Sequence, residues 1–203
     1  GYDYEMIYFN SDGFRGTMCG NGGRCTAAFA LKHGIAGTSQ RFMAPDGIHE
    51  ARSENNIIRL TMSDVKNIST ISGNYFINTG SPHYVVFTSD LDKLDVFSEG
   101  RKLRWSDDFK PGGTNVNFVE IQKDGIFVRT FERGVEDETL SCGTGVTASA
   151  IASVLSGHFV SAPVKVRTRG GELKVEFEKR ADMITGINLC GPATFVFEGT
   201  VEI

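Results

Sequence analysis

Two stretches of the chain are copies of one motif. The segments CGNGGRCTAAFALKHG, which begins at Cys19, and CGTGVTASAIASVLSG, which begins at Cys142, align without a gap. They share the cysteine, both glycines of a Cys-Gly-X-Gly turn, an alanine and the closing glycine. Each segment predicts a helix after the turn, over residues 21–33 and 144–156, that ends at a glycine. The repeat predicts an internal duplication, which limits the chain to folds with two similar halves.

The elements on either side of the two helices follow the same order. A strand-like run and a polar loop precede each cysteine, with MIYFN in the first copy and FVRTFE in the second. Two strand-like stretches follow each helix and are joined by a turn, at Asp46-Gly47 and at Gly170-Gly171. The first copy has far fewer residues before its cysteine than the second. We therefore expect the chain to lack an N-terminal part of the first domain.

Short apolar runs separated by glycines predict a chain rich in strands. The clearest runs are Glu5–Phe9, Ile57–Met62, Tyr84–Phe87, Asn117–Ile121, Ile126–Phe131 and Leu173–Phe177. With one helix in each copy, they predict an α+β fold of two pseudo-symmetric domains, each a curled, mainly antiparallel, barrel-like sheet wrapped around a central α-helix. The expected domains are residues 1–72 with 192–203, and residues 73–191, with the functional site in the cleft between them.

Composition excludes several classes of function. The formal net charge is −4 and no cluster of basic residues occurs, so the chain has no electrostatic footprint for nucleic acid. No apolar run reaches the roughly 18 residues of a membrane span, and the first residues lack the features of a signal peptide. Four cysteines in 203 residues are too few for a disulfide framework. We therefore expect reduced cysteines in a cytoplasmic protein without a nucleic-acid or membrane partner.

A cysteine at the start of each helix indicates acid–base chemistry. The unpaired N–H groups and positive end of a helix stabilise a thiolate and bind a carboxylate. Two such helix starts in one cleft would place the thiols of Cys19 and Cys142 on opposite faces of one carbon atom. One thiolate then removes a proton and the other thiol returns one, which inverts the stereocentre. This mechanism needs no pyridoxal phosphate, other cofactor or metal.

The two motifs resemble a known family. The stretches MIYFNSDGFRGTMCGNGGRC and FERGVEDETLSCGTG are similar to the two signature regions of the diaminopimelate epimerases, cofactor-independent enzymes of bacterial lysine and peptidoglycan precursor synthesis. The resemblance covers essentially the whole chain. It implies that the chain converts LL-diaminopimelate to meso-diaminopimelate, with Cys19 and Cys142 as the two bases. It also implies that backbone N–H groups hold the reacting carboxylate, from Gly20, Asn21, Gly143 and Thr144.

The resemblance assigns further residues to the rest of the substrate. It implies that polar side chains contact the distal end and the ammonium groups: Asn10, Ser81, Asn115, Glu132 and Arg133. A guanidinium suits a second carboxylate and a carboxylate suits an ammonium group, so a diamino diacid fits this set. His83, in the GSPH stretch, is a supporting residue. The family has Asn where this chain has Ser81.

Other readings of the sequence remain open at this point. They are another amino-acid racemase or epimerase without pyridoxal phosphate, a non-catalytic amino-acid-binding relative, and a redox sensor that uses Cys19 and Cys142. Cys25 and Cys190 are expected to serve packing, and no Cys or His spacing predicts a zinc site. The resemblance further implies a homodimer, and a final strand, FVFEGTVEI, that returns to the sheet of the first domain.

Overall fold

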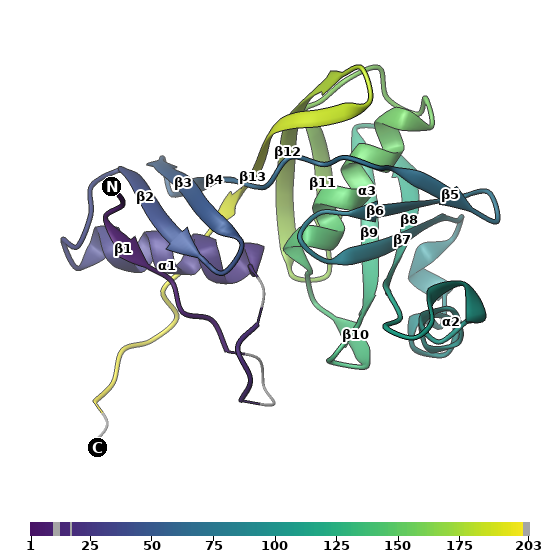
Figure 1. The fold of residues 1–203 in the computed structure, drawn as a ribbon, viewed down its shortest axis with the longest axis horizontal. Coiled ribbons are helices and arrows are strands. Elements are labelled where there is room, and N and C mark those ends of the chain that lie inside the picture. The colour runs from purple at the N-terminus through teal and green to yellow at the C-terminus, as the bar shows by residue number, and fades with distance from the viewer. Residues whose placement is uncertain (10–12, 17, 201–203) are drawn as a thin grey trace.

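The computed structural model describes residues 1–9, 13–16 and 18–200 (Figure 1). The α-helices are α1 (Gly20–Lys32), α2 (Val96–Arg104) and α3 (Gly143–Leu155), with short 3-10 helices at Leu91–Lys93 and Asp107–Phe109. The strands are β1 (Tyr4–Glu5), β2 (Ser39–Ala44), β3 (Gly47–Glu54), β4 (Ile57–Thr61), β5 (Ser69–Ile71), β6 (Asn74–Asn78), β7 (Pro82–Phe87), β8 (Asn115–Gln122), β9 (Gly125–Glu132), β10 (Asp137–Thr139), β11 (Val164–Thr168), β12 (Gly171–Arg180) and β13 (Met183–Pro192).

All of these strands belong to one mixed sheet, which runs through both lobes of the molecule. Their order is β1-β2-β3-β4-β13-β12-β11-β9-β8-β7-β6-β5, and β10 pairs with β9 to one side. In Figure 1 the first lobe holds α1 and β1 to β4, and the second holds α2, α3 and the strands from β5 onward. The two lobes join where β13 pairs antiparallel with β4. The predicted α+β fold with two similar halves is therefore confirmed, whereas the exact domain boundaries stay a prediction.

The duplication is visible in strand pairing. Helix α1 leads into the antiparallel β2–β3 hairpin and then β4, and α3 leads into the antiparallel β11–β12 hairpin and then β13. The hairpin glycines Gly47 and Gly171 both have a φ of +132°, which favours a residue without a side chain. Strand β1 pairs parallel with β2, as β9 does with β11. The β4–β13 seam is therefore the centre of the pseudo-symmetry.

Both predicted helices form, one residue earlier than expected. Their C-caps are His33 and Ser156, and the next residues, Gly34 and Gly157, have φ values of +67° and +81°. Such positive φ angles end a helix at little cost only when the residue is glycine. The local signals in the motif therefore determine where both helices stop.

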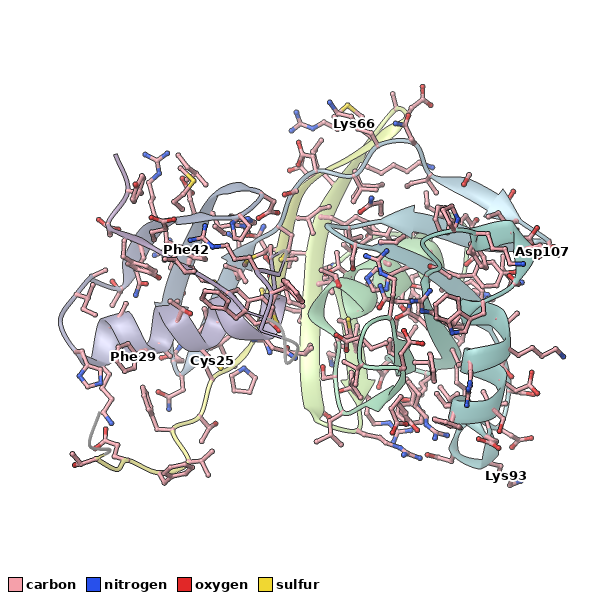
Figure 2. The ribbon with its side chains drawn as sticks, turned by 60° about the horizontal axis from the view of Figure 1, so that its bottom comes forward. Cys25, Phe29, Phe42, Lys66, Lys93 and Asp107 are labelled. Carbon is pink, nitrogen blue, oxygen red and sulfur yellow. The ribbon has the colours of Figure 1, made fainter. Side chains whose placement is uncertain are left out.

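The two central helices differ in how completely the sheet covers them. Residues 143–153 of α3 are all buried, and this helix packs against strands β6 to β9 and β11 to β13. Helix α1 buries one face, against β3, β4 and β13. Cys25 is exposed and Phe29 is 49% exposed, on the side of α1 away from Phe42 and the strands (Figure 2). In these described residues the second lobe therefore encloses its helix and the first does not.

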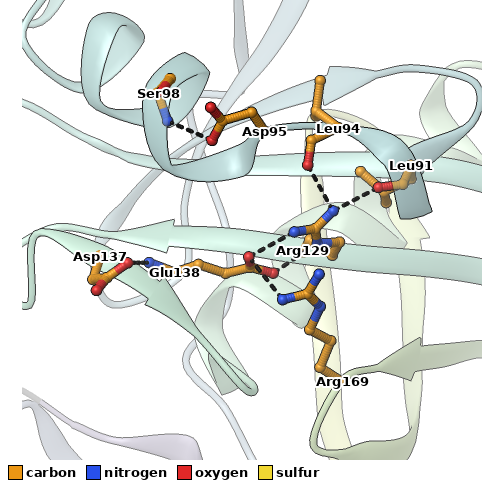
Figure 3. Close-up of polar contacts among 8 residues, drawn as sticks. All are labelled: Leu91, Leu94, Asp95, Ser98, Arg129, Asp137, Glu138 and Arg169. Atoms are coloured by element: carbon orange, nitrogen blue, oxygen red, sulfur yellow. Dashed lines mark hydrogen bonds and ion pairs between the residues drawn. The ribbon is translucent and has the colours of Figure 1, made fainter.

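A paired arginine fixes the outer layer of the second lobe to β9 (Figure 3). The guanidinium of Arg129 donates two hydrogen bonds of 2.7 Å to the carboxylate of Glu138. It also donates to the carbonyl oxygens of Leu91 and Leu94, at 2.7 and 2.9 Å, and Arg169 donates to Glu138 at 3.1 Å. Arg129 is buried and its charge is fully paired. This cluster holds α2 and its preceding turn against the strand that ends at the predicted site.

Two predictions about secondary structure need correction. Helix α2 was not expected, because its sequence is short and contains Gly100 in the middle. The segment FVFEGTVEI was expected to form a returning strand, but residues 193–200 contain no strand, and 201–203 lie outside the described residues. Strand β13, just before this segment, joins the two lobes instead. Within the described residues no helix is long and apolar enough to span a membrane.

Candidate active site

The starts of α1 and α3 meet between the two lobes. Cys19 and Cys142 are the N-cap residues of these helices, with φ and ψ of −110° and 115° in the first and −112° and 111° in the second. Gly20 and Gly143 follow them and lie back to back. An ideal Cβ atom at Gly20 would lie 2.8 Å from Cδ2 of Leu189 and 3.3 Å from Cα of Gly143. The absence of side chains at both positions allows the two helix starts to touch.

A cavity of about 330 Å³ opens at this junction and contains both cysteines. Ten residues predicted from sequence line it: Cys19, Gly20, Asn21, Ser81, Asn115, Glu132, Arg133, Cys142, Gly143 and Thr144. The structure describes one of the other two predicted residues. Asn10 lies outside the described residues, and His83 is fully buried behind the lining, next to Thr144. The structure therefore brings together nearly all of the predicted set.

The sulfur of Cys19 is accessible and interacts with groups of its own lobe. The N–H of Gly22 donates a hydrogen bond to Sγ over 3.3 Å, as expected at an N-cap. The hydroxyl of Tyr8 interacts with the same sulfur. The negative charge of a Cys19 thiolate, followed by burial and a hydrogen bond to the same sulfur, raises the pKa of Tyr8. Tyr8 therefore stays protonated and acts as a donor toward Cys19.

Cys142 has a different environment. It is 8% exposed, and burial, reinforced by the negative charge of Glu132, raises the pKa of its thiol to about 12. Burial also raises the pKa of Glu132, although hydrogen bonds from Thr139 and from the Cys142 thiol favour its charged form. The Thr139 hydroxyl donates to Oε2 of Glu132 over 2.9 Å. Cys142 is therefore a thiol at neutral pH, with its proton directed toward a carboxylate.

His83 is held as a neutral imidazole. The side-chain amide of Asn117 donates to Nδ1 of His83 over 3.0 Å, which leaves Nε2 as the protonated nitrogen. Burial, followed by the positive charge of Arg133, lowers the pKa of His83 to about 3. An imidazole with this pKa does not carry a proton at physiological pH. Its structural effect is therefore to direct one N–H group into the site.

The N–H group of His83 continues into a chain of hydroxyls. The single N–H at Nε2 is shared between Oγ1 of Thr144, at 2.8 Å, and Oγ of Ser81, at 2.9 Å. Because Thr144 accepts from His83, its own proton is free to point toward Sγ of Cys142, 3.4 Å away. The hydroxyl of Thr144 thus partly offsets the effect of burial on the Cys142 thiol. Ser81 and Thr144 are fixed in the cavity wall by this chain.

The other end of the cavity is positively charged. The backbone N–H of Arg133 donates to Oδ1 of Asn115 at 2.8 Å, and the amide of Asn115 donates to the carbonyl of Pro82 at 2.8 Å. Nearby Arg104 is ion-paired with Glu136 at 3.0 Å. By contrast, the guanidinium of Arg133 has no ion-pair partner in the part of the chain that the structure describes. Asn115 therefore orients the backbone of Arg133 and leaves its charge available to an anion.

Seven of the described cavity residues were not predicted from the sequence, and three of these carry ionisable side chains. Tyr8, Arg15 and Arg104 line the same space, from the strand-like run before the first motif, from the first loop and from α2. Tyr8 stands within the quoted signature MIYFN, which was a usable signal. Arg104 lies in the unpredicted helix α2, and nothing local in the sequence indicates that it reaches the cavity.

Comparison with known proteins supports these observations. Residues 75–196 match the family model described as diaminopimelate epimerase. A protein named diaminopimelate epimerase from Flavobacterium psychrophilum is 48% identical to this chain, over 98% of this chain and 78% of that protein. The chain belongs to the diaminopimelate epimerase family. The resemblance inferred from the two signature stretches is therefore confirmed.

Further relatives agree with this family membership. The diaminopimelate epimerase of Chlorobaculum tepidum is 44% identical, over 99% of this chain and 81% of that protein. Among solved structures, a phenazine biosynthesis protein of the PhzF family from Bacillus anthracis has a TM-score of 0.79 at 16% identity, over 98% of this chain and 80% of that chain. A probable proline racemase from Agrobacterium radiobacter has a TM-score of 0.72 at 18% identity, over 98% and 72% of the two chains. At these identities the two structures show a shared fold.

Proposed function

We propose that this chain epimerises LL-diaminopimelate to meso-diaminopimelate by a two-base mechanism without pyridoxal phosphate, in lysine and peptidoglycan precursor biosynthesis. The observation that carries the proposal is the pair of matched N-cap residues, Cys19 and Cys142, which open onto one cavity. Membership of the diaminopimelate epimerase family supports the choice of substrate. The unpaired guanidinium of Arg133 supports a second, distal carboxylate.

The carboxylate beside the reacting carbon binds between the two helix starts in this mechanism. Four backbone N–H groups hold it, those of Gly20, Asn21, Gly143 and Thr144. Removal of the α-proton places negative charge on this carboxylate, and N–H groups that are already oriented stabilise the developing charge. The back-to-back contact of Gly20 and Gly143 supports the assignment, because it brings both sets of donors to one point.

The two thiols transfer protons on opposite faces of the carbon. Cys19, as a thiolate, takes the α-proton and forms an S–H bond. Cys142, as a thiol, breaks its S–H bond and protonates the opposite face, which inverts the centre. The raised pKa of Cys142, to about 12, supports its role as the acid in this direction. In the reverse direction the two residues exchange roles.

The remaining polar residues bind the far end of the substrate. Arg133 pairs with the distal carboxylate, and Glu132 contacts an ammonium group. Asn115 and Ser81 complete this end, and the proposal includes Asn10, which lies outside the described residues. Glu132 then has two partners, the ammonium group and the Cys142 thiol. His83 supports this set by holding Ser81 and Thr144.

The proposal extends to assembly and location. A cytoplasmic protein is supported by the four cysteines, all of which are free. A homodimer is supported by the family resemblance alone, and its test is the mass of the protein in solution by light scattering. A mass of about one chain would contradict the dimer and would leave the reaction unaffected.

The test of the reaction is exchange of the α-proton with solvent. Purified protein, kept reduced, is incubated with LL-diaminopimelate in deuterated water, and mass spectrometry and chiral chromatography follow the products. We expect deuterium at the α-carbon together with the meso isomer. A folded wild-type protein that incorporates no deuterium would contradict the proposal.

A further inference from the structure

Arg24 is a buried cation without an acidic partner. It lies in the second turn of α1 and is 7% exposed. Burying a guanidinium is costly unless a carboxylate pairs with it, as Glu138 does with Arg129. Among the described residues no carboxylate pairs with Arg24, and its Nε atom has no hydrogen-bond partner. Stability alone does not explain an arginine at this position.

The hydrogen bonds of Arg24 lead from the first lobe to the second. Nη1 donates to the carbonyl of Gly20 at 3.3 Å, and Nη2 donates to Oδ1 of Asn21 at 3.0 Å. The amide of Asn21 then donates to the carbonyl of Ser141 at 2.7 Å. Ser141 immediately precedes Cys142. A continuous chain of hydrogen bonds therefore runs from Arg24 to the backbone that carries the second cysteine.

The equivalent residue in α3 does not form such a chain of hydrogen bonds. When the two motifs are aligned, Thr147 occupies the position of Arg24. Its hydroxyl donates to the carbonyl of Gly143 at 3.0 Å, which matches the contact of Arg24 with Gly20. Thr147 is too short to extend further and carries no charge. Nη2 of Arg24, the atom that donates to Asn21, therefore has no counterpart in the second copy.

We propose that Arg24 is a positioning residue for the epimerase reaction, which fixes the side chain of Asn21 and through it the spacing of the two cysteines. The inference rests on the proposed function. Asn21 is oriented from one side by Arg24 and holds Ser141 on the other, so the starts of α1 and α3 are tied across the cavity. Loss of Arg24 frees Asn21 to rotate, and the loop before Cys142 loses its contact with the first lobe.

The first test replaces Arg24 and separates turnover from binding. For Arg24→Met we expect kcat to fall by about tenfold or more, because small displacements of reacting groups have effects of this size. KM should change by less than about threefold, since the distal contacts of the substrate are intact. Arg41→Met, which removes an exposed arginine on β2, is the matched control and should keep wild-type kcat. Wild-type kcat in folded Arg24→Met would overturn the inference.

A conservative variant distinguishes the hydrogen bonds from the charge. Arg24→Lys keeps a buried cation but has one nitrogen, which cannot bridge Gly20 and Asn21 in the way that a guanidinium does. We expect kcat of Arg24→Lys to stay within about threefold of Arg24→Met. Full recovery with lysine would overturn the proposed hydrogen-bond chain. If Arg24→Met does not fold, Arg24→Lys carries the same test, with a kcat well below wild type as the expected result.

A double-mutant cycle tests whether Arg24 acts through Asn21. In an Asn21→Ala background, Arg24→Met should reduce kcat by less than about twofold, because the chain is already broken. Multiplication of the two separate effects would overturn the inference. A second readout does not depend on activity: alkylation of Cys142 by iodoacetamide, measured by peptide mass, should become at least about threefold faster in Arg24→Met.

The two readouts distinguish failure of this inference from failure of the proposed function. A wild-type protein without α-proton exchange contradicts the proposed function, and faster alkylation of Cys142 in Arg24→Met still supports the hydrogen-bond chain. A wild-type protein that exchanges normally, with Arg24→Met equal to it in kcat and alkylation, contradicts the inference alone.

Discussion

The starts of α1 and α3 have the same backbone and different surroundings. Cys19 and Cys142 have nearly equal φ and ψ angles, and each precedes a glycine. Cys19 is partly exposed and accepts a backbone N–H, whereas Cys142 is buried beside Glu132 and makes no capping bond. Duplication therefore supplied the geometry twice, whereas burial and the charge of Glu132 raise the pKa of the Cys142 thiol. The two copies therefore keep one backbone geometry and differ in the environment of the sulfur.

The largest expected effect comes from removing either sulfur. Cys19→Ala and Cys142→Ala should each lower the rate of epimerisation by at least about 10³-fold, because each removes a group that transfers a proton. The double variant should be little worse than either single one, since the two act as a unit. Steady-state assays measure this, with exposed Cys25→Ala as the control at about the wild-type rate. Independent, multiplying effects would contradict a paired mechanism.

The contact between the two helix starts is the next feature to break. Gly20→Ala places a Cβ atom 2.8 Å from Leu189 and 3.3 Å from Gly143, so the helix starts must move apart. We expect the rate to fall by about 10- to 100-fold. Gly37→Ala, where nothing lies within 4 Å of the new atom, is the matched control. A Gly20→Ala protein with the wild-type rate would show that close approach is not required.

The charge of Glu132 sharpens the difference between the cysteines. Its carboxylate helps raise the pKa of Cys142, so Glu132→Gln should lower that pKa and increase the thiolate fraction at any given pH below it. Alkylation of Cys142 by iodoacetamide, followed from pH 7 to pH 10, should become several-fold faster. An increase of this size corresponds to a pKa of Cys142 that is lower by about one unit or less. Glu178→Gln, at an exposed position of β12, is the control. Unchanged alkylation would mean that burial alone sets this pKa.

The smallest effect concerns two histidines, one in each lobe. The folded-state pKa of His83 is lowered to about 3, so its contribution to stability is lost as pH falls from about 6.5 toward 3. Despite burial, hydrogen bonds to Asp46 and Thr61 raise the pKa of His49, so its contribution is present below pH 6.5 and is lost as pH rises.

Urea unfolding of His83→Gln and His49→Gln at pH 5 and pH 7 tests this pair. Relative to wild type, the change in unfolding free energy between these two pH values should have opposite signs in the two variants. Each proton is worth at most about 1.4 kcal/mol per pH unit. Equal signs would contradict the neutral, buried state of His83.

The sequence predicts the repeated elements well because their signals are local. The Cys-Gly-X-Gly turn and closing glycine mark both helices to within one residue, and alternating apolar runs mark most strands. Helix α2 escaped prediction for a tertiary reason: a glycine disfavours a helix, and Gly100 is needed because it packs directly against Phe131, where a Cβ atom would not fit. The joining role of β13 also depends on pairing with a distant strand, which no local pattern indicates.

The site shows the same division between local and distant information. The two cysteines and their glycines were predicted from the motif itself, and the structure places them in one cavity. The contributions of Tyr8 and Arg104 depend on partners elsewhere in the fold. The hydrogen bond between Asn21 and Ser141 joins residues 120 positions apart in the chain. Sequence therefore reveals which groups have the chemistry, whereas the contacts that orient them require the folded chain.

Leu189 lies beneath both helix starts, on the strand that pairs with each lobe. Its Cδ2 atom is 2.8 Å from the ideal Cβ position of Gly20 and 2.9 Å from that of Gly143. One methyl group thus packs against both helix starts and limits how closely they approach each other. The spacing of the two helix starts therefore depends on a single apolar side chain that belongs to neither motif.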